Sequence, residues 1–173
     1  MNRTSRIMII VLALVSLVAL NGCGRIAEKA AESAVEGVTG IDVEENGDNI
    51  TIETDEGTVE IDSGGDELPA DFPDDMPVYD ATITNQGKVS TGDGTMWSVT
   101  MTSGDAFDSV VAWYKDELAD SDWRQDALLE STTPNNNATF VVSQGETANG
   151  AVAINEPESG GDVEITITLT VNP

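Results

Sequence analysis

The sequence predicts an α+β fold in which one long helix packs against an antiparallel sheet, in the element order ββαββββ over residues 68–173. Residues 163–171 alternate strictly between apolar and polar side chains, which is the period of a strand with one buried face. Residues 105–119 instead repeat apolar side chains at the helical period of about 3.6. A single long helix between runs of strands is typical of an α+β domain.

Composition limits the partners of the chain. The 173 residues include 7 basic and 32 acidic side chains, a formal net charge of −25, with one cysteine and no histidine. Nucleic acid is not expected as a partner, because binding to phosphates requires Lys and Arg. Anionic lipid headgroups are repelled as well, so a lipid anchor would have to hold the chain at a membrane. The acidic surface also fits simple solubility or a high-salt habitat.

Four segments are predicted along the chain. They are a signal peptide (1–22), a lipid-anchored spacer (23–40), an acidic β-meander with a linker (41–67) and the α+β domain (68–173).

The first residues have the pattern of an export signal. Arg3 and Arg6 form a basic start, and the apolar run over residues 7–20 is shorter than the roughly 20 residues that span a membrane. Soon after this run comes Cys23, the only cysteine of the chain. A lone cysteine in an exported protein cannot form an internal disulfide and requires another explanation.

The residues around this cysteine supply that explanation. Leu20, Asn21, Gly22 and Cys23 resemble the cleavage motif of bacterial lipoprotein signal peptides, although Asn21 stands where Ala or Ser is usual. The resemblance implies cleavage between Gly22 and Cys23, with a diacylglycerol thioether and an amide-linked acyl chain on Cys23. Two or more acyl chains anchor a protein stably. We therefore expect a lipoprotein facing outside the cytoplasm, on the cell membrane or, since Gly24 is not Asp, the outer membrane.

Two further patterns precede the main domain. Residues 25–37 have a thin, alanine-rich apolar face, which predicts a short spacer helix. Residues 41–62 change to a period of two, with apolar residues such as Ile50 and Ile52 alternating with polar ones. Turn residues separate these short runs, so a small β-meander is expected.

A calcium loop is an alternative interpretation of the first part of this meander. Asp42, Glu44, Asn46, Asp48 and Glu53 fall at positions 1, 3, 5, 7 and 12 of an EF-hand-like loop. The residues after Glu53 cannot open the exit helix of an EF-hand. A turn between two acidic strands has the same composition without binding a metal, and this interpretation is preferred.

The main domain begins with an extended arm. Residues 68–77 contain three prolines, which remove backbone donors and favour extended conformations. Period-two patterns bounded by turn residues then predict strands on both sides of the helix. The strands are expected at residues 81–85, 88–90, 95–102, 125–132, 138–143, 150–155 and 163–171.

The helix is predicted over residues 105–119. Asp105 is the expected N-cap, because its carboxylate could accept a hydrogen bond from a free backbone N–H group of the first turn. Five apolar residues form one stripe toward the core, while Asp116, Glu117 and Asp120 face away. The stripe consists of Phe107, Val110, Val111, Tyr114 and Leu118.

A series of short motifs runs through the arm, the helix and the residue that follows it. It consists of Asp71-Phe72-Pro73, Met76-Pro77-Val78-Tyr79, the helical residues 110–118, and Trp123. Together these motifs are similar to a group of predicted bacterial lipoproteins and exported domains of unknown function, over residues 68–173. This chain has Ser121-Asp122 before the tryptophan, where glycine is expected. The resemblance implies no established activity.

The residue inventory argues against an enzyme. Without histidine the chain has no Ser-His-Asp triad, no Cys-His pair and no histidine-bound metal. No cofactor motif is present, and no cofactor is expected. A pair of carboxylates of the glycosidase kind remains an alternative, although nothing singles out one pair.

Three tryptophans invite a sugar-binding interpretation. Core roles are preferred for Trp97, Trp113 and Trp123, because their positions follow the apolar faces of the predicted elements. Trp113 is the one expected to be most exposed.

The leading functional hypothesis is a non-catalytic, lipid-anchored envelope module that binds an envelope protein or a cell-wall polymer. A calcium- or cation-binding exported protein is the first alternative. A small carboxylate-dependent hydrolase is the second.

Overall fold

The computed structural model describes residues 42–46, 49–54, 57–62, 67–69, 71–132, 135–157 and 160–173. The chain divides into two compact units, Met1–Ile41 and Asp42–Pro173, and the described residues belong to the second. The predicted signal peptide, Gly22, Cys23, the predicted spacer and Asp48 therefore lie outside the described residues. Within those described ranges, no helix combines the length and apolar character needed to span a bilayer.

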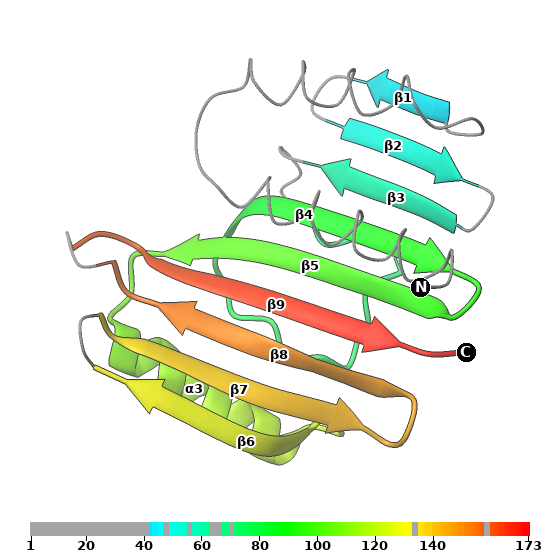
Figure 1. The fold of residues 1–173 in the computed structure, drawn as a ribbon. Coiled ribbons are helices and arrows are strands. Elements are labelled where there is room, and N and C mark those ends of the chain that lie inside the picture. The colour runs from blue at the N-terminus through cyan, green and yellow to red at the C-terminus, as the bar shows by residue number, and fades with distance from the viewer. Residues whose placement is uncertain are drawn as a thin grey trace. The chain divides into compact units, whose positions relative to one another are not determined.

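The described residues form one antiparallel sheet of nine strands (Figure 1). Its spatial order is β1-β2-β3-β4-β5-β9-β8-β7-β6, so the C-terminal strand lies between β5 and β8. The strands are β1 (Asp42–Asn46), β2 (Asn49–Thr54), β3 (Gly57–Asp62), β4 (Thr82–Thr91), β5 (Gly94–Ser103), β6 (Arg124–Ser131), β7 (Asn137–Gln144), β8 (Ala148–Asn155) and β9 (Val163–Val171).

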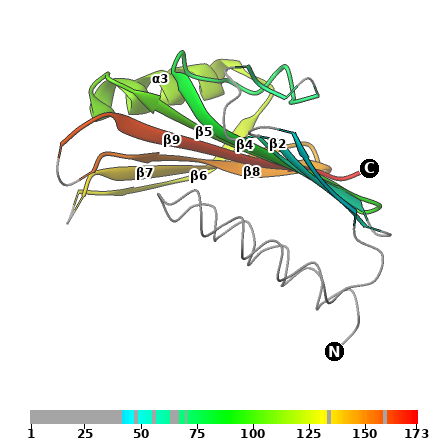
Figure 2. The same cartoon turned by 90° about the horizontal axis from the view of Figure 1, so that it is seen from above.

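One helix, α3 (Phe107–Asp120), follows β5 and lies on one face of the sheet, against β6 and β8 (Figure 2). The prediction of one long helix on an antiparallel sheet is confirmed. All five residues of the predicted apolar stripe are buried, and Asp116, Glu117 and Asp120 are exposed. The apolar stripe of α3 thus covers one face of the sheet. On the central strands β5 and β9, every second residue points to this face and most of these residues are buried there, as expected for an antiparallel sheet that is covered on one side.

The hydrophobic core fills the space between α3 and the sheet. On β9 the odd-numbered residues from Val163 to Leu169 are buried, and the residues between them are partly or fully exposed. The largest fully buried side chains are Trp123, Tyr114, Phe140, Met101, Ile154, Ile165, Ile167 and Leu169.

Two predicted strands, 81–85 and 88–90, are in fact one strand, β4. Gln86 and Gly87, which separate them in the sequence, pair with Val99 and Ser98 of β5. A register shift between Ile83 and Asn85 marks a bulge. The bulge lies within the first predicted strand, whereas Gln86 and Gly87 stay in the ladder because β3 and β5 pair with them on both sides.

The predicted N-cap of the helix is wrong. Ala106 occupies the N-cap position without a side-chain cap, and α3 begins at Phe107. The carboxylate of Asp105 instead accepts hydrogen bonds from the hydroxyl groups of Tyr79 at 2.7 Å and Ser103 at 3.2 Å. A contact from the distant arm therefore replaces the local capping interaction.

Strands β1, β2 and β3 correspond to the meander predicted over residues 41–62, ahead of the predicted linker. β3 pairs with β4 from Gly57 to Asp62, so the meander extends the main sheet. Glu60 lies opposite Lys88, and their charged groups are 3.5 Å apart.

Gly150 marks a close approach between β8 and β9. A Cβ atom at Gly150 would lie 2.2 Å from the carbonyl oxygen of Thr168 and 2.7 Å from Cδ2 of Leu169. We expect Gly150→Ala to lower the free energy of unfolding by about 1–3 kcal/mol, because a central strand would have to shift. Denaturant unfolding measures the loss, with Gly92→Ala as the control, since a Cβ at Gly92 meets nothing within 4 Å. Equal stability of the two variants would contradict this strand packing.

Candidate functional site

The interface between α3 and the sheet is filled by side chains. Tyr114, Trp123 and Phe140 have no exposed surface, and the rings of Tyr114 and Phe140 lie 6.0 Å apart. Ile167 in the middle of β9 is equally buried. Large side chains therefore occupy the position between helix and sheet where a ligand would otherwise be enclosed.

An open pocket of about 460 Å³ lies where α3 ends and β6 begins. Leu118 and Trp123 are buried beneath it, and Ala119 is exposed at its edge. The lining residues are Lys115, Leu118, Ala119, Ser121, Asp122, Trp123, Arg124 and Gln125. Because Leu118 and Trp123 are almost fully buried, the surface of this open pocket is formed largely by polar and charged residues together with Ala119.

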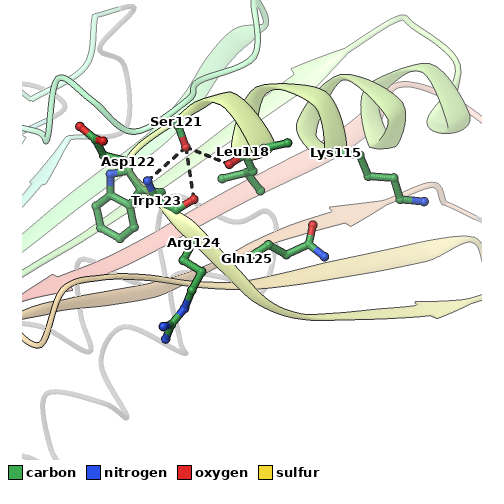
Figure 3. Close-up of a pocket in the computed structure, with 8 residues that line it drawn as sticks. Lys115, Leu118, Ser121, Asp122, Trp123, Arg124 and Gln125 are labelled. Atoms are coloured by element: carbon green, nitrogen blue, oxygen red, sulfur yellow. Dashed lines mark hydrogen bonds between the residues drawn. The ribbon is translucent and has the colours of Figure 1, made fainter.

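Ser121 shapes the turn that forms this pocket (Figure 3). Its hydroxyl oxygen lies 3.3 Å from the carbonyl oxygens of both Leu118 and Trp123, and it accepts a hydrogen bond from the backbone N–H of Trp123 at 3.2 Å. Ser121 also takes the C-cap position of α3 with an extended backbone. These contacts end the helix and direct the chain into β6.

Two basic side chains lie on the rim. Among the described residues the basic ones are Lys88, Lys115 and Arg124, and the last two line the pocket. Lys115 lies 3.1 Å from a carboxylate oxygen of Glu130, and Arg124 lies 2.6 Å from one of Asp126. Figure 3 shows the charged ends of Lys115 and Arg124 pointing in different directions.

These ion pairs are open to solvent. The side chains of Lys115 and Arg124 are 44% and 74% exposed. Exposed pairs contribute about 0–1 kcal/mol each, so a polar ligand group could replace either carboxylate at little cost. Hydrogen bonding from Ser143, followed by that from Arg124, lowers the pKa of Asp126, so this carboxylate is ionised at neutral pH.

Asp75 of the arm fixes the tryptophan beneath the pocket. Its carboxylate accepts a hydrogen bond from the indole Nε1 of Trp123 at 3.2 Å and another from the side-chain amide of Gln144. The bond from Gln144 is the main reason that the pKa of Asp75 is lowered, and the bond from Trp123 adds to it.

Asp71 makes the equivalent contact at the other tryptophan of the core. It accepts a hydrogen bond from Nε1 of Trp97 at 3.4 Å and lies 2.7 Å from Nζ of Lys88. Burial acts to raise the pKa of Asp71, but the hydrogen bonds from Lys88 and Trp97 outweigh it, and the pKa is lowered. The arm is therefore held to the domain by two ionised carboxylates.

The tryptophans largely serve the core, as predicted. Trp97 and Trp123 are 6% and 0% exposed, and Trp113 is the most exposed of the three at intermediate burial. Trp113 packs edge-on against Tyr79 and Tyr114, with ring centroids 5.1 Å and 4.8 Å apart. Trp97 and Trp123 are too deeply buried to serve as a sugar platform, and Trp113 is only partly exposed.

Four of the five alternative calcium residues, Asp42, Glu44, Asn46 and Glu53, lie on strands β1 and β2. Asp42 pairs with Glu53 and Asn46 with Asn49, so β1 and β2 run side by side. At about 3.4 Å per residue, Asp42 and Asn46 are roughly 13 Å apart along an extended strand, whereas an EF-hand loop wraps around its ion. No group of three or more acidic or cysteine residues within the described ranges is placed to hold a metal ion.

The family whose model matches this chain is described as START domain-like, and the match covers residues 81–170. The chain belongs to this START domain-like family. No curated protein and no solved structure matches the chain. The START domain-like region includes β4 to β9 and α3, whereas β1 to β3 and the arm precede it.

The pocket of this START domain-like region was not anticipated from the sequence. Its residues are nearly contiguous, from Lys115 to Gln125, but no known binding motif marks them. The replacement of glycine by Ser121-Asp122 before Trp123 was the one local signal, because those residues form the turn at the pocket.

Asp75 provides a test of how the arm supports this site. Asp75→Ala should lower the free energy of unfolding by about 1–2 kcal/mol, because the buried indole N–H of Trp123 loses its acceptor. The pKa of Asp75 is lowered on folding, so its stabilising effect is present above its ordinary value of 3.8 and is lost as the pH falls through the folded value. The difference between Asp75→Ala and the parent should therefore shrink in acid.

Thermal unfolding of the two proteins across this pH range measures the effect. Asp74→Ala is the matched control, since Asp74 is the neighbouring exposed carboxylate and the indole of Trp123 donates to Asp75 instead. An equal loss of stability in both variants would show that the carboxylate of Asp75 does not support Trp123.

Proposed function

We propose that this protein is a non-catalytic ligand-binding module, held outside the cytoplasm by a lipid on Cys23. Membership of the START domain-like family suggests ligand binding. Family membership alone does not specify a ligand, so the site has to be argued from the residues themselves.

The observation that carries the proposal is the pocket between α3 and β6. Its floor contains Leu118 and Trp123, and its rim offers Lys115 and Arg124 together with the carboxylate of Asp122. Such a site suits a small ligand that carries a polar or charged group and rests its remaining surface on the end of the helix. The filled interface between α3 and the sheet favours this open pocket over an enclosed cavity as the binding position.

The pocket can be tested with the fluorescent amphiphile 1-anilinonaphthalene-8-sulfonate as the probe. Ala119→Phe places a ring at the edge of the pocket, and we expect it to weaken binding by at least about tenfold, because the added ring would occupy the space of the probe. Fluorescence titration of the full chain measures the dissociation constant.

Ala112→Phe is the matched control, because Ala112 is exposed on the same helix but does not line the pocket. It should bind the probe like the parent. Equal binding by both variants would place the probe elsewhere and contradict the proposed site. Unchanged unfolding temperatures confirm that each variant is folded.

Membrane attachment rests on the sequence around Cys23. We expect the parent in the membrane fraction of cells and Cys23→Ala in the soluble or secreted fraction, because the thioether-linked lipid would be missing. Fractionation with incorporation of a labelled fatty acid measures both properties. Equal membrane retention and labelling of Cys23→Ala would contradict lipidation at this residue.

The same pair of strains can identify a macromolecular neighbour. Cross-linking in intact cells followed by mass spectrometry would reveal an envelope protein that is captured only with the lipidated parent. Such a result would add a protein partner to the small-molecule site.

A further inference from the structure

The face of the sheet turned away from α3, called the outer face below, carries few charges among the side chains that the structure describes. On β5 the residues Met96, Ser98, Thr100 and Thr102 lie on this face, because the alternate residues are buried under the helix. Their neighbours on β9 are threonines, for example Thr168 opposite Ser98. The centre of the outer face is therefore uncharged and made of small side chains.

Few charges interrupt this face among the described side chains. Glu164 lies at one end of β9, opposite Thr102, and Arg124 and Asp126 pair with each other at the irregular start of β6. By contrast, the exposed surface of α3 carries acidic residues such as Asp116 and Glu117. In a chain of net charge −25, the described charges are thus concentrated on the helix side and at the edges.

An apolar patch occupies the β2–β5 half of the outer face. Ile52, Val59, Val89 and Met96 lie directly opposite one another across the four strands. All four side chains are half-buried. Two of these strands, β2 and β3, precede the part of the chain that matches the START domain-like family.

A second apolar patch lies at the other end of the outer face. Ala127, Val141 and Ala151 stand opposite one another across β6, β7 and β8. Leu129, next along β6 on the same face, is 60% exposed, and Val141 is 36% exposed. They are the large hydrophobic residues of the described part that face water most.

We propose that the outer face binds a second copy of this chain, so that two sheets pack face to face. Two molecules of net charge −25 repel each other wherever carboxylates meet. The outer face is a broad surface on which two copies can meet without bringing carboxylates together. Because the remaining surface is acidic, association would stop at a dimer.

The geometry of the sheet suits such a dimer. Nine strands about 4.8 Å apart and about eight residues long give a face of roughly 1,000 Å², compared with the roughly 800 Å² that each partner buries in a standard interface. β5 is the central strand of the sheet. A two-fold axis along β5 would place the β2–β5 patch of each copy over the β6–β8 patch of the other, in a self-complementary interface.

The test compares the same substitution on the two sides of the domain. Ser98→Asp introduces a charge at the centre of the outer face, and Ser109→Asp introduces one on the exposed side of α3. All proteins in this test are full chains that carry Cys23→Ser. Sedimentation equilibrium should show dimers for the chain with Cys23→Ser alone and for the chain that also carries Ser109→Asp. Association of Ser98→Asp should weaken by at least about tenfold, because two like charges face each other at the axis.

Cysteine cross-linking provides a second measurement, and this substitution adds no charge to the outer face. In the same Cys23→Ser background, a short bis-maleimide reagent should link Ser98→Cys into a covalent dimer and should not link Ser109→Cys. A reagent with a spacer is needed because packed sheets lie about 10 Å apart, which is too far for a direct disulfide. A monomeric parent without a Ser98→Cys cross-link would overturn the proposal. A dimer that survives Ser98→Asp unchanged, in a folded protein without that cross-link, would also overturn it. Binding of the monomer to phosphatidylcholine vesicles through this face would assign the surface to a membrane instead.

Discussion

The packing of the apolar stripe of α3 onto one face of the sheet is the interaction on which the other features depend. Tyr114 stands at its centre, without exposed surface and in contact with the rings of Tyr79, Trp113 and Phe140. Burial raises the pKa of Tyr114, so its hydroxyl is neutral and accepts the backbone N–H of Tyr79 at 3.3 Å. The helix, the arm and the sheet are thereby joined at one residue.

This packing also decides where function can reside. Because large side chains fill the helix–sheet interface, binding is directed to the surface, where the turn at Ser121 leaves an open pocket above Trp123. Because α3 covers only one face, the opposite face of the sheet must meet water or a partner. That face carries little charge although the chain is strongly acidic, which separates it chemically from the helix side.

Strong local patterns predicted much of the fold. Strand β9 has the predicted bounds of 163–171, and the five stripe residues of α3 are buried, because each pattern continues over enough residues to be unambiguous. Long-range contacts explain the misses: Asp105 bonds to Tyr79 instead of capping α3, and Gln86 and Gly87 are held in β4 by both neighbouring strands. The pocket was not predicted because it is formed by the turn that ends α3, and no sequence motif indicates the geometry of that turn.

The most direct measurement of the central claim is an NMR titration that follows the indole N–H signals of the three tryptophans as 1-anilinonaphthalene-8-sulfonate is added. Trp123 lines the pocket and Trp97 does not, although the indole N–H group of each donates to a carboxylate of the arm, Asp75 and Asp71 respectively. Binding at the open pocket predicts a saturable shift of the Trp123 signal while the Trp97 signal stays in place. Coupled shifts of Trp97, Trp113 and Trp123 would show that the ligand enters between α3 and the sheet, and would contradict a filled interface with a surface site.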